Sequence, residues 1–431
     1  MNVIRFTDAD FEQQRRRLAA PSSLFDPDIE QRTRQVVEAV KARGDAALCE
    51  LTHRFDGAQL TASQFRIRAE ELQAAVAHTS NELREAIANA ERNLRNFSTK
   101  SLRRGWSAKN PQGGKVGEKY DPFGRVGIYI PGGTAPLVST VLMTVTLAKV
   151  AGCREIVVCT PCNARGEVNP GILYAADVAG ATEIYRAGGA QAIAAMAFGT
   201  STISKVHKIF GPGNAYVVAA KRLLFGQVAV DLLPGPSEVL IIADETARPE
   251  FIAADLLAQA EHGSGHERTW LITTCGRLLG EIQAALERQL SSLSRQDFIR
   301  KALDDNGWLI HLESMEEAVR MANDLAPEHC EIMAKKAAAI AQQITTAGAL
   351  CLGHFTPNVL GDYVAGPSHV LPTGGAGASF AGLTVDQFQR RTSLIQYDRA
   401  ALAKSVATIQ KFAQVEGLDA HGRSATIRLE E

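Results

Sequence analysis

The sequence predicts an α/β protein with two Rossmann-like, incompletely doubly wound parallel-sheet domains and small helical extensions at both ends. From Val126 onward, short β-branched runs alternate with helical stretches of about 10 to 18 residues, which is typical of strand–helix–strand units. Parallel strands require such crossover helices, so we expect parallel sheets. The same rhythm resumes at Val239. This second run indicates two α/β units rather than one.

The composition indicates a soluble globular protein that acts on a small molecule. The 431 residues include 46 Lys and Arg against 47 Asp and Glu, and 45% are hydrophobic, which excludes disordered and collagen-like classes. A net charge of −1 gives no general attraction to nucleic acid or to a membrane. The seven scattered cysteines do not resemble a disulfide framework. With no recognisable signal peptide, we expect a cytoplasmic protein.

Helices are predicted along the first part of the chain. Asp26-Pro27 supplies an N-cap and a proline at the first helical position, and Gly44 ends this helix. A second helical region covers about residues 69–96. Residues 101–125 then become basic, glycine-rich and irregular, with a turn signal at Gly113-Gly114. We expect a domain boundary or a hairpin there.

Strands and helices alternate through most of the remaining chain. Helices are expected near 248–262, 278–294 and 314–324, and an apolar stripe predicts an amphipathic helix over about 400–416 that must pack on something. The expected strands are 126–130, 155–159, 182–185, 205–210, 228–233, 239–243, 270–274 and 308–311.

Two glycine turns follow apolar strands and precede helices. They are IPGGT at 130–134 and FGPGN at 210–214. Each places backbone N–H groups at a helix N-terminus, where a phosphate or another polar ligand could bind. Tight strand–helix turns explain them equally well. The sequence contains no clean G-x-G-x-x-G fingerprint.

Two pairs of residues are candidates for metal binding and acid–base chemistry. Gln259 and His262 lie three residues apart at a predicted helix end, where one face could present both to one metal ion. A histidine at the negative end of a helix dipole is the simpler explanation. Glu328 and His329 are adjacent acid–base groups in a loop-like position after a helix, although a surface turn gives the same pattern.

Two further pairs lie near the C-terminus. Asp362 and His369 lie seven apart in a Gly- and Pro-rich loop, which suits a site where one side chain binds a cation and the other a ligand. Chance spacing is the alternative. Glu416 and His421 follow the predicted tail helix, where such side chains are ordinarily solvated. The residues alone leave each of these assignments open.

Taken in order, these motifs resemble the histidinol dehydrogenase family over nearly the whole chain. The resemblance rests on ordered blocks, and not on any single motif. The blocks are VGIYIPGG at 126–133, GGAQAIA at 188–194, IFGPGN at 209–214, GPSE at 235–238, QAEHG at 259–263, APEH at 326–329 and the segment 362–373.

The resemblance implies one catalytic Zn²⁺ per subunit, and nitrogen and oxygen ligands suit that ion. The implied zinc ligands are Gln259, His262, Asp362 and His421, and these four residues also contact substrate. The other implied substrate contacts are Ser237, His329, His369 and Glu416. The implied NAD contacts are Tyr129, Gln191 and Asn214.

The implied reaction oxidises L-histidinol through L-histidinaldehyde to L-histidine, in the last steps of histidine biosynthesis, with two NAD molecules reduced. His329 takes the alcohol proton, and Glu328 with His329 activates water to attack the aldehyde. In the family, the partner subunit supplies the C-terminal tail. We therefore expect a homodimer in which Glu416 and His421 complete the neighbouring site.

The resemblance also implies a division of the chain. We expect an N-terminal extension of residues 1–25, and a discontinuous α/β domain of residues 26–127 and 238–382 that carries most of the zinc and catalytic site. Residues 128–237 should form a Rossmann-like domain that contacts NAD. Residues 383–431 should form the helical tail that reaches the partner subunit.

Two other functions stay open at this point. A paralogous zinc and NAD alcohol dehydrogenase that oxidises another polyol or a sulfonated alcohol should lose the groups that read the amino-imidazole end of histidinol. His369 and Glu416 are both present, which favours histidinol. A zinc hydrolase would use Glu328 to activate metal-bound water, but it would not need the repeated strand–helix units with two glycine turns.

Overall fold

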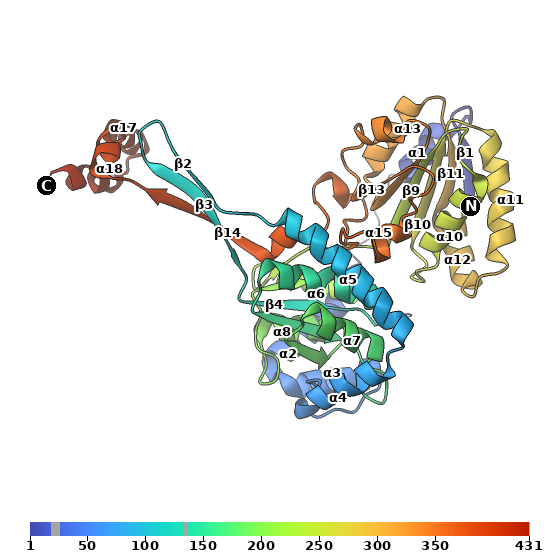
Figure 1. Cartoon of the computed structure of the whole chain (residues 1–431), viewed down its shortest axis with the longest axis horizontal. Coiled ribbons are helices and arrows are strands. Elements are labelled where there is room, and N and C mark those ends of the chain that lie inside the picture. The colour runs from blue at the N-terminus through green and yellow to red at the C-terminus, as the bar shows by residue number, and fades with distance from the viewer. Residues whose placement is uncertain (19–25, 133–135, 431) are drawn as a thin grey trace.

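A computed structural model describes residues 1–18, 26–132 and 136–430. It contains two α/β bodies, each built on a parallel sheet, and an arm that projects from the smaller body and ends at the C-terminus (Figure 1). The expected α/β class with two parallel sheets is confirmed. Gly133-Thr134 of the first glycine turn lies outside the described residues. Across the described ranges, no helix is long and apolar enough to cross a membrane.

The larger sheet has six parallel strands in the order β1-β11-β10-β9-β12-β13. Every residue of β9 (Glu238–Ala243) and β12 (His329–Met333) is buried, as strands covered on both faces require. The other strands are β1 (Asn2–Arg5), β10 (Arg268–Thr273), β11 (Gly307–His311) and β13 (Ala349–Leu352). One face packs on α10 (Pro249–Ala260), α11 (Arg277–Leu290) and α12 (Gln296–Asn306), and the other on α1 (Phe11–Leu18), α13 (Met315–Leu325) and α14 (Ala337–Ala341).

The smaller sheet has five parallel strands in the order β6-β5-β4-β7-β8. They are β4 (Arg125–Tyr129), β5 (Glu155–Thr160), β6 (Glu183–Arg186), β7 (Lys208–Phe210) and β8 (Ala229–Val230). One face packs on α4 (Ala69–His78), α5 (Asn81–Ser101), α6 (Val138–Ala151) and α7 (Pro170–Ala179), and the other on α2 (Pro27–Arg43), α3 (Asp45–Asp56), α8 (Gly189–Phe198) and α9 (Ala215–Leu224). The strand order changes direction between β4 and β7, which is the point where open α/β sheets bind ligands.

The N-terminal part of the chain packs differently from the expected division. We expected residues 26–127 to form a domain with 238–382, but helices α2 to α5 pack on the five-stranded sheet. Likewise, β1 is not part of a separate extension, because it pairs with β11 at the edge of the six-stranded sheet. The periodicity of an amphipathic helix shows that one face is buried, but not which sheet buries it.

Two predicted helices are each divided in the structure. The region 69–96 contains α4 and α5, because the hydroxyl of Ser80 accepts the N–H of Leu83 and starts a new helix. The tail region 400–416 contains α16 (Arg399–Ala403) and α17 (Val406–Glu416). An apolar stripe that continues along the sequence therefore does not show that the helix is continuous.

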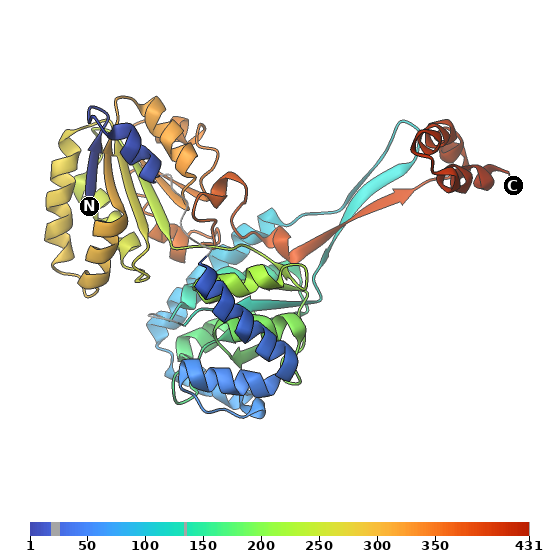
Figure 2. The same ribbon diagram turned by 180° about the vertical axis from the view of Figure 1, so that it is seen from behind.

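Residues 101–125 form a hairpin, which was one of the two expectations for them. Strands β2 (Trp106–Lys109) and β3 (Lys115–Pro122) pair antiparallel, and β14 (Gln389–Gln396) pairs along the whole of β3. This ribbon carries α16, α17 and α18 (Asp419–Thr426) away from both bodies (Figure 2). The exposed side chains of this arm include Ile395 of β14 and Val415 of α17, at 75% and 73% exposure. Within the described chain, the arm therefore presents apolar surface to solvent.

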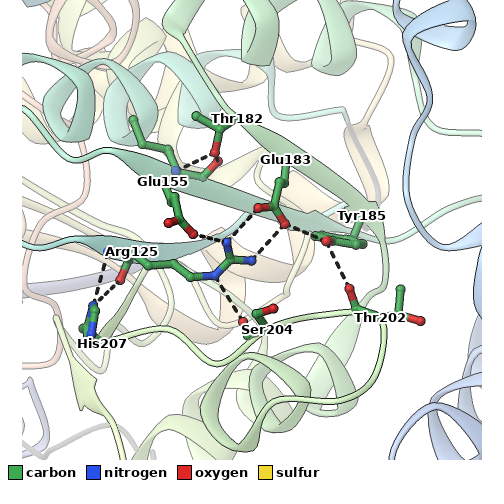
Figure 3. Close-up of polar contacts among 9 residues, drawn as sticks. Arg125, Glu155, Thr182, Glu183, Tyr185, Thr202, Ser204 and His207 are labelled. Carbon is green, nitrogen blue, oxygen red and sulfur yellow. Dashed lines mark hydrogen bonds and ion pairs between the residues drawn. The ribbon is translucent and has the colours of Figure 1, made fainter.

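A charged cluster joins the amino ends of β4, β5 and β6 (Figure 3). Arg125 donates to both carboxylate oxygens of Glu183, at 2.7 and 2.8 Å, and also pairs with Glu155. The hydroxyl of Tyr185 donates to Glu183 at 2.6 Å. These hydrogen bonds, above all those from Arg125, hold the pKa of Glu183 at about 2 although partial burial opposes the shift. The cluster therefore links three neighbouring strands through side chains as well as backbone.

Candidate active site

The acid–base pair lies at the start of a buried strand. His329 is the first residue of β12, and both Glu328 and His329 are buried, so these residues do not form a surface turn. Ala326 ends α13 with φ 46°, a left-handed conformation that costs about 1–2 kcal/mol for a residue with a Cβ. The chain passes directly from this strained turn into the acid–base pair.

The backbone of Glu238 orients both members of this pair. Glu328 Oε2 accepts the N–H of Glu238 at 2.8 Å, and His329 Nδ1 donates to the Glu238 carbonyl at 3.1 Å. A carbonyl oxygen only accepts, so Nδ1 carries a proton. His329 Nε2 then faces Asp362, with 3.5 Å between Nε2 and Oδ1.

Burial and neighbouring charges shift the pKa values of the pair. Burial raises the pKa of Glu328 to about 8, and His329 opposes this shift. Burial lowers the pKa of His329, but the carboxylates of Glu328 and Asp362 raise it by more. The resulting pKa is about 9. Burial raises the pKa of Asp362, but the neighbouring His329, His369 and His262 outweigh this effect and bring the pKa below its ordinary range. Such groups can exchange protons with a substrate near neutral to alkaline pH.

Gln259 and His262 are adjacent, but not because they share a helix face. Helix α10 ends at Ala260, so His262 lies beyond the helix and the expected shared face is wrong. The contact is instead a hydrogen bond from His262 Nδ1 to the Gln259 carbonyl at 3.0 Å. This bond keeps the proton on Nδ1 and makes the Nε2 lone pair available to a cation. The Gln259 side chain is buried, and its Oε1 accepts Asn358 Nδ2 at 3.0 Å.

Asp362 and His369 complete the group and connect it to the smaller sheet. Asp362 lies in the short helix α15 (Val359–Tyr363), and its carbonyl accepts His369 Nδ1 at 3.0 Å. His369 Nε2 is 3.1 Å from the hydroxyl of Thr140, in the first turn of α6. Because α6 follows β4, this contact brings the carboxyl edge of the five-stranded sheet to the amino edge of the six-stranded sheet. Ser237 immediately precedes β9 at that amino edge.

The expected NAD contacts lie at the carboxyl edge of the five-stranded sheet. Tyr129 is the last residue of β4, Gln191 lies in the first turn of α8, and Asn214 caps α9 shortly after β7. The hydroxyl of Tyr129 accepts the N–H of Gly189 at 3.0 Å. Asn214 Oδ1 accepts two backbone N–H groups of α9. All three residues therefore surround the point where the strand order reverses.

Glu416 and His421 are not brought to this site by their own chain. Both are exposed on the helical end of the arm, far from the two sheets (Figure 1). Among residues 1–18, 26–132 and 136–430, no three His, Cys, Asp or Glu side chains group in a way that could hold a metal ion. One chain thus gathers Gln259, His262 and Asp362 in one place and carries the fourth expected ligand elsewhere.

The family is decided by the comparison with known proteins. A family model described as histidinol dehydrogenase matches residues 21–429. The chain belongs to the histidinol dehydrogenase family. The histidinol dehydrogenase of Geobacillus kaustophilus is 45% identical over 396 residues, covering 92% of this chain and 93% of that protein. That of Syntrophotalea carbinolica is 41% identical over 431 residues, covering 100% of both.

A solved structure agrees with this assignment. The crystal structure of histidinol dehydrogenase from Elizabethkingia anophelis matches with a TM-score of 0.95 and 38% identity, over 100% of this chain and 98% of that chain. As a member of the histidinol dehydrogenase family, the protein is an NAD-dependent oxidoreductase of histidine biosynthesis.

The gathered residues fit the zinc ion that membership of the histidinol dehydrogenase family implies. Gln259 Oε1, His262 Nε2 and the Asp362 carboxylate are nitrogen and oxygen donors of the kind that zinc takes. Hydrogen bonds from Asn358 and to the Gln259 carbonyl already orient the first two. Three donors from one chain would leave the coordination of a zinc ion incomplete, so further ligands would have to come from the substrate or from a partner subunit.

Sequence reasoning missed three residues of this histidinol dehydrogenase site: Glu238, Thr140 and Asn358. Glu238 ends the GPSE block, so its position next to Ser237 could have indicated it. Thr140 and Asn358 stand in no recognisable motif. Their contacts join residues 229 and 99 positions apart in the chain, and local patterns do not report such distances.

Proposed function

We propose that the protein oxidises L-histidinol through L-histidinaldehyde to L-histidine, with one Zn²⁺ per site and two NAD molecules reduced in turn. Membership of the histidinol dehydrogenase family supports the substrate and the reaction class. The zinc part is carried by one observation: Gln259, His262 and Asp362 converge beside the Glu328-His329 pair.

The proposed reaction removes four electrons from one carbon. Alcohol, two NAD⁺ and one water give the carboxylate, two NADH and three H⁺. Bound zinc would hold the imidazole and amino groups of the substrate, and bound NAD would supply the hydride acceptor. The chain must therefore orient the carbinol carbon, remove the hydroxyl proton and deliver water to the aldehyde.

His329 and Glu328 divide the proton transfers between them. His329 Nε2 would take the hydroxyl proton as hydride leaves the carbon, because Nδ1 is already committed to the Glu238 carbonyl. Asp362, once engaged with a cation, would favour the imidazolium less, which would lower the pKa of His329. Glu328, once deprotonated, would accept a proton from the water that attacks the aldehyde.

The remaining substrate contacts are assigned by position. His369 and Ser237 lie at the rim where the two sheets meet, and we assign them to the substrate. Tyr129, Gln191 and Asn214 would contact NAD on the opposite side of this rim. Hydride transfer requires the two ligands side by side, which the meeting of the two sheet edges at Thr140 and His369 supports.

We further propose that the active unit is a homodimer with shared sites. Glu416 and His421 stand on the arm, whose exposed side chains include Ile395, Phe412 and Val415. An exposed apolar surface of this kind is typical of an interface. A second copy that receives the arm would gain His421 as fourth zinc ligand and Glu416 as a substrate contact.

The test is the amount of NADH formed per L-histidinol consumed by purified, zinc-loaded protein, beside a chelated sample. We expect two NADH per substrate, lost on chelation and restored by zinc. Two NADH per substrate from metal-free protein would contradict the zinc assignment. No NADH from histidinol, despite bound zinc and NAD, would move the protein to the paralogous dehydrogenases that oxidise another alcohol.

A further inference from the structure

A buried asparagine connects two of the proposed zinc ligands. Asn358 is 1% exposed and begins helix α15. Its Nδ2 donates to Gln259 Oε1 at 3.0 Å, and its carbonyl accepts the N–H of Asp362 at 3.2 Å. One residue therefore touches both a ligand on α10 and a ligand in α15.

Glu331 holds this asparagine in place. Its Oε1 accepts the backbone N–H of Asn358 at 2.7 Å, and the Glu331 side chain is itself buried. Side chains alternate along a strand, so Glu331 lies on the same face of β12 as His329, two residues earlier. The carboxylate thus anchors the first residue of α15 directly behind the acid–base pair.

Helix periodicity brings a second carboxyl group to the same place. Asp255 precedes Gln259 by four residues on α10, so the two side chains lie on one face of the helix. Burial raises the pKa of both Asp255 and Glu331, and the charge of Asp255 raises the pKa of Glu331 further, so the two carboxyl groups can retain a proton between them. The folded protein can therefore bury the Asp255 and Glu331 side chains next to the proposed site.

We propose that Asn358 is a positioning residue that aims Gln259 Oε1 at the zinc ion, and that Glu331 keeps Asn358 in register. The inference rests on the proposed function, because it needs Gln259 as a ligand. A glutamine amide can turn its oxygen or its nitrogen toward a cation, and only the oxygen can bind. The carbonyl oxygen has two lone pairs, so it can accept from Asn358 and bind zinc at once. The Asn358 donor thereby selects the productive orientation.

The variant Asn358→Ser tests this role with little risk to the fold. The Asn358 side chain makes no capping hydrogen bond to α15, so the substitution removes no cap, and the serine hydroxyl is too short to reach Gln259. Loss of such a partner to a ligand typically weakens metal binding about 10–100-fold. We expect the Kd for Zn²⁺, measured on the full-length protein by chelator competition, to rise by that factor. The visible spectrum of the Co²⁺-substituted protein should change as well.

Two controls separate positioning from general damage. Asn323→Ser removes the bond from Asn323 Nδ2 to the Gln343 carbonyl and the bond from Thr345 N to Asn323 Oδ1, each 2.8 Å and outside the proposed site, and should leave the Kd unchanged. Glu331→Gln keeps an oxygen that can accept the N–H of Asn358, whereas Glu331→Leu does not. We expect a Kd near the wild-type value for the glutamine variant and a raised Kd for the leucine variant. Should Asn358→Ser fail to fold, the comparison of these two Glu331 variants decides.

A double-mutant cycle with Gln259→Ala gives the decisive result. If Asn358 acts through Gln259, Asn358→Ser should change the Kd less than twofold in the Gln259→Ala background. An equal effect with and without Gln259, or a Kd for Asn358→Ser within twofold of wild type, would overturn the inference. An unchanged zinc affinity in Gln259→Ala alone would instead remove Gln259 from the ligand set. The two failures are thus distinguishable.

Discussion

Replacing Glu183 with glutamine should weaken the five-stranded sheet selectively at neutral pH. Glu183 accepts two hydrogen bonds from Arg125 and one from Tyr185. The side chains of Arg125 and Glu183 are 9% and 17% exposed, and that of Glu155, the other carboxylate on Arg125, is 49% exposed. The variant therefore leaves a buried guanidinium that has lost its less exposed carboxylate partner and keeps the more exposed Glu155.

The size of the effect follows from the pKa of Glu183. Folding lowers this pKa from 4.5 to about 2, and each unit is worth about 1.36 kcal/mol, which gives an upper limit of about 3.4 kcal/mol at pH 7. The cluster lies at a sheet edge that water reaches, so screening reduces this to roughly 1.5–2 kcal/mol. Because folding lowers the pKa of Glu183, its carboxylate stabilises the folded state fully above pH 4.5. This stabilisation is lost as the pH falls through 2. About two-fifths of the stabilisation by Glu183 should remain at about pH 3.

Hydrogen–deuterium exchange measures both sheets in one experiment. Peptides from 125–186 report the opening of the small sheet, and peptides from 238–273 report that of the large sheet as an internal control. At pH 7, Glu183→Gln should lower the opening free energy of β4 to β6 by roughly 1.5–2 kcal/mol and leave β9 and β10 unchanged. Glu155→Gln, at the exposed partner, should cost less than about 1 kcal/mol.

Two results would refute this reasoning. A loss from Glu183→Gln that is equal at pH 7 and pH 3 would show that the charge of Glu183 is not its source. Equal losses in the two sheets would show general destabilisation. In either case the Arg125 cluster would not be the element that holds the three strands together.

The other predictions concern the proposed site. His262→Asn should abolish zinc retention, measured by metal analysis; stoichiometric zinc in this variant would remove His262 from the ligand set. His329→Asn should keep its zinc but oxidise histidinol about 10²–10⁴-fold more slowly, and unchanged turnover would argue against its role as base. Oxidation of L-histidinaldehyde should rise with pH through about 8, because Glu328 must lose its proton to act as a base, and Glu328→Gln should abolish that rise. A variant that keeps the rise would assign it to another group. Deleting residues 415–431 should abolish activity, and mixing with His329→Asn should restore part of it; a fully active truncated monomer would contradict shared sites.

Helices and strands could be predicted because the burial of their side chains repeats every few residues along the chain. The strand expected at 155–159 is found as Glu155–Thr160, and that at 239–243 as Glu238–Ala243. Both are short runs of β-branched and apolar residues, as strands buried on both faces require. The division between α4 and α5 was missed although Ser80 is a good N-cap, because a cap competes with a continuous helical pattern on either side.

The site was predictable as a set of residues but not as a geometry. The ordered blocks indicated Gln259, His262, Glu328, His329 and Asp362, and the structure brings these five together. The shared helix face expected for Gln259 and His262 was wrong, because the helix ends at Ala260 and the contact runs through a backbone carbonyl instead. Helical spacing therefore predicted correctly that Gln259 and His262 are neighbours, but not the contact that joins them.

The sequence by itself therefore determined the α/β class, the five strands of the smaller sheet, three of the six strands of the larger sheet and the residue blocks that identify the family, since these depend on short-range periodicity and on residue identity. Strands β1, β12 and β13 were not expected. Only the tertiary structure decided which sheet buries α2 to α5, and that the amino edge of one sheet meets the carboxyl edge of the other at His369 and Thr140. It also placed helices α17 and α18, which carry Glu416 and His421, on an arm away from the two sheets. Helices α2 to α5 bury apolar faces against distant segments, while the meeting of the two sheets and the course of the arm involve the Thr140–His369 contact and the pairing of β3 with β14. A helix or strand carries the same local pattern whichever partner covers it.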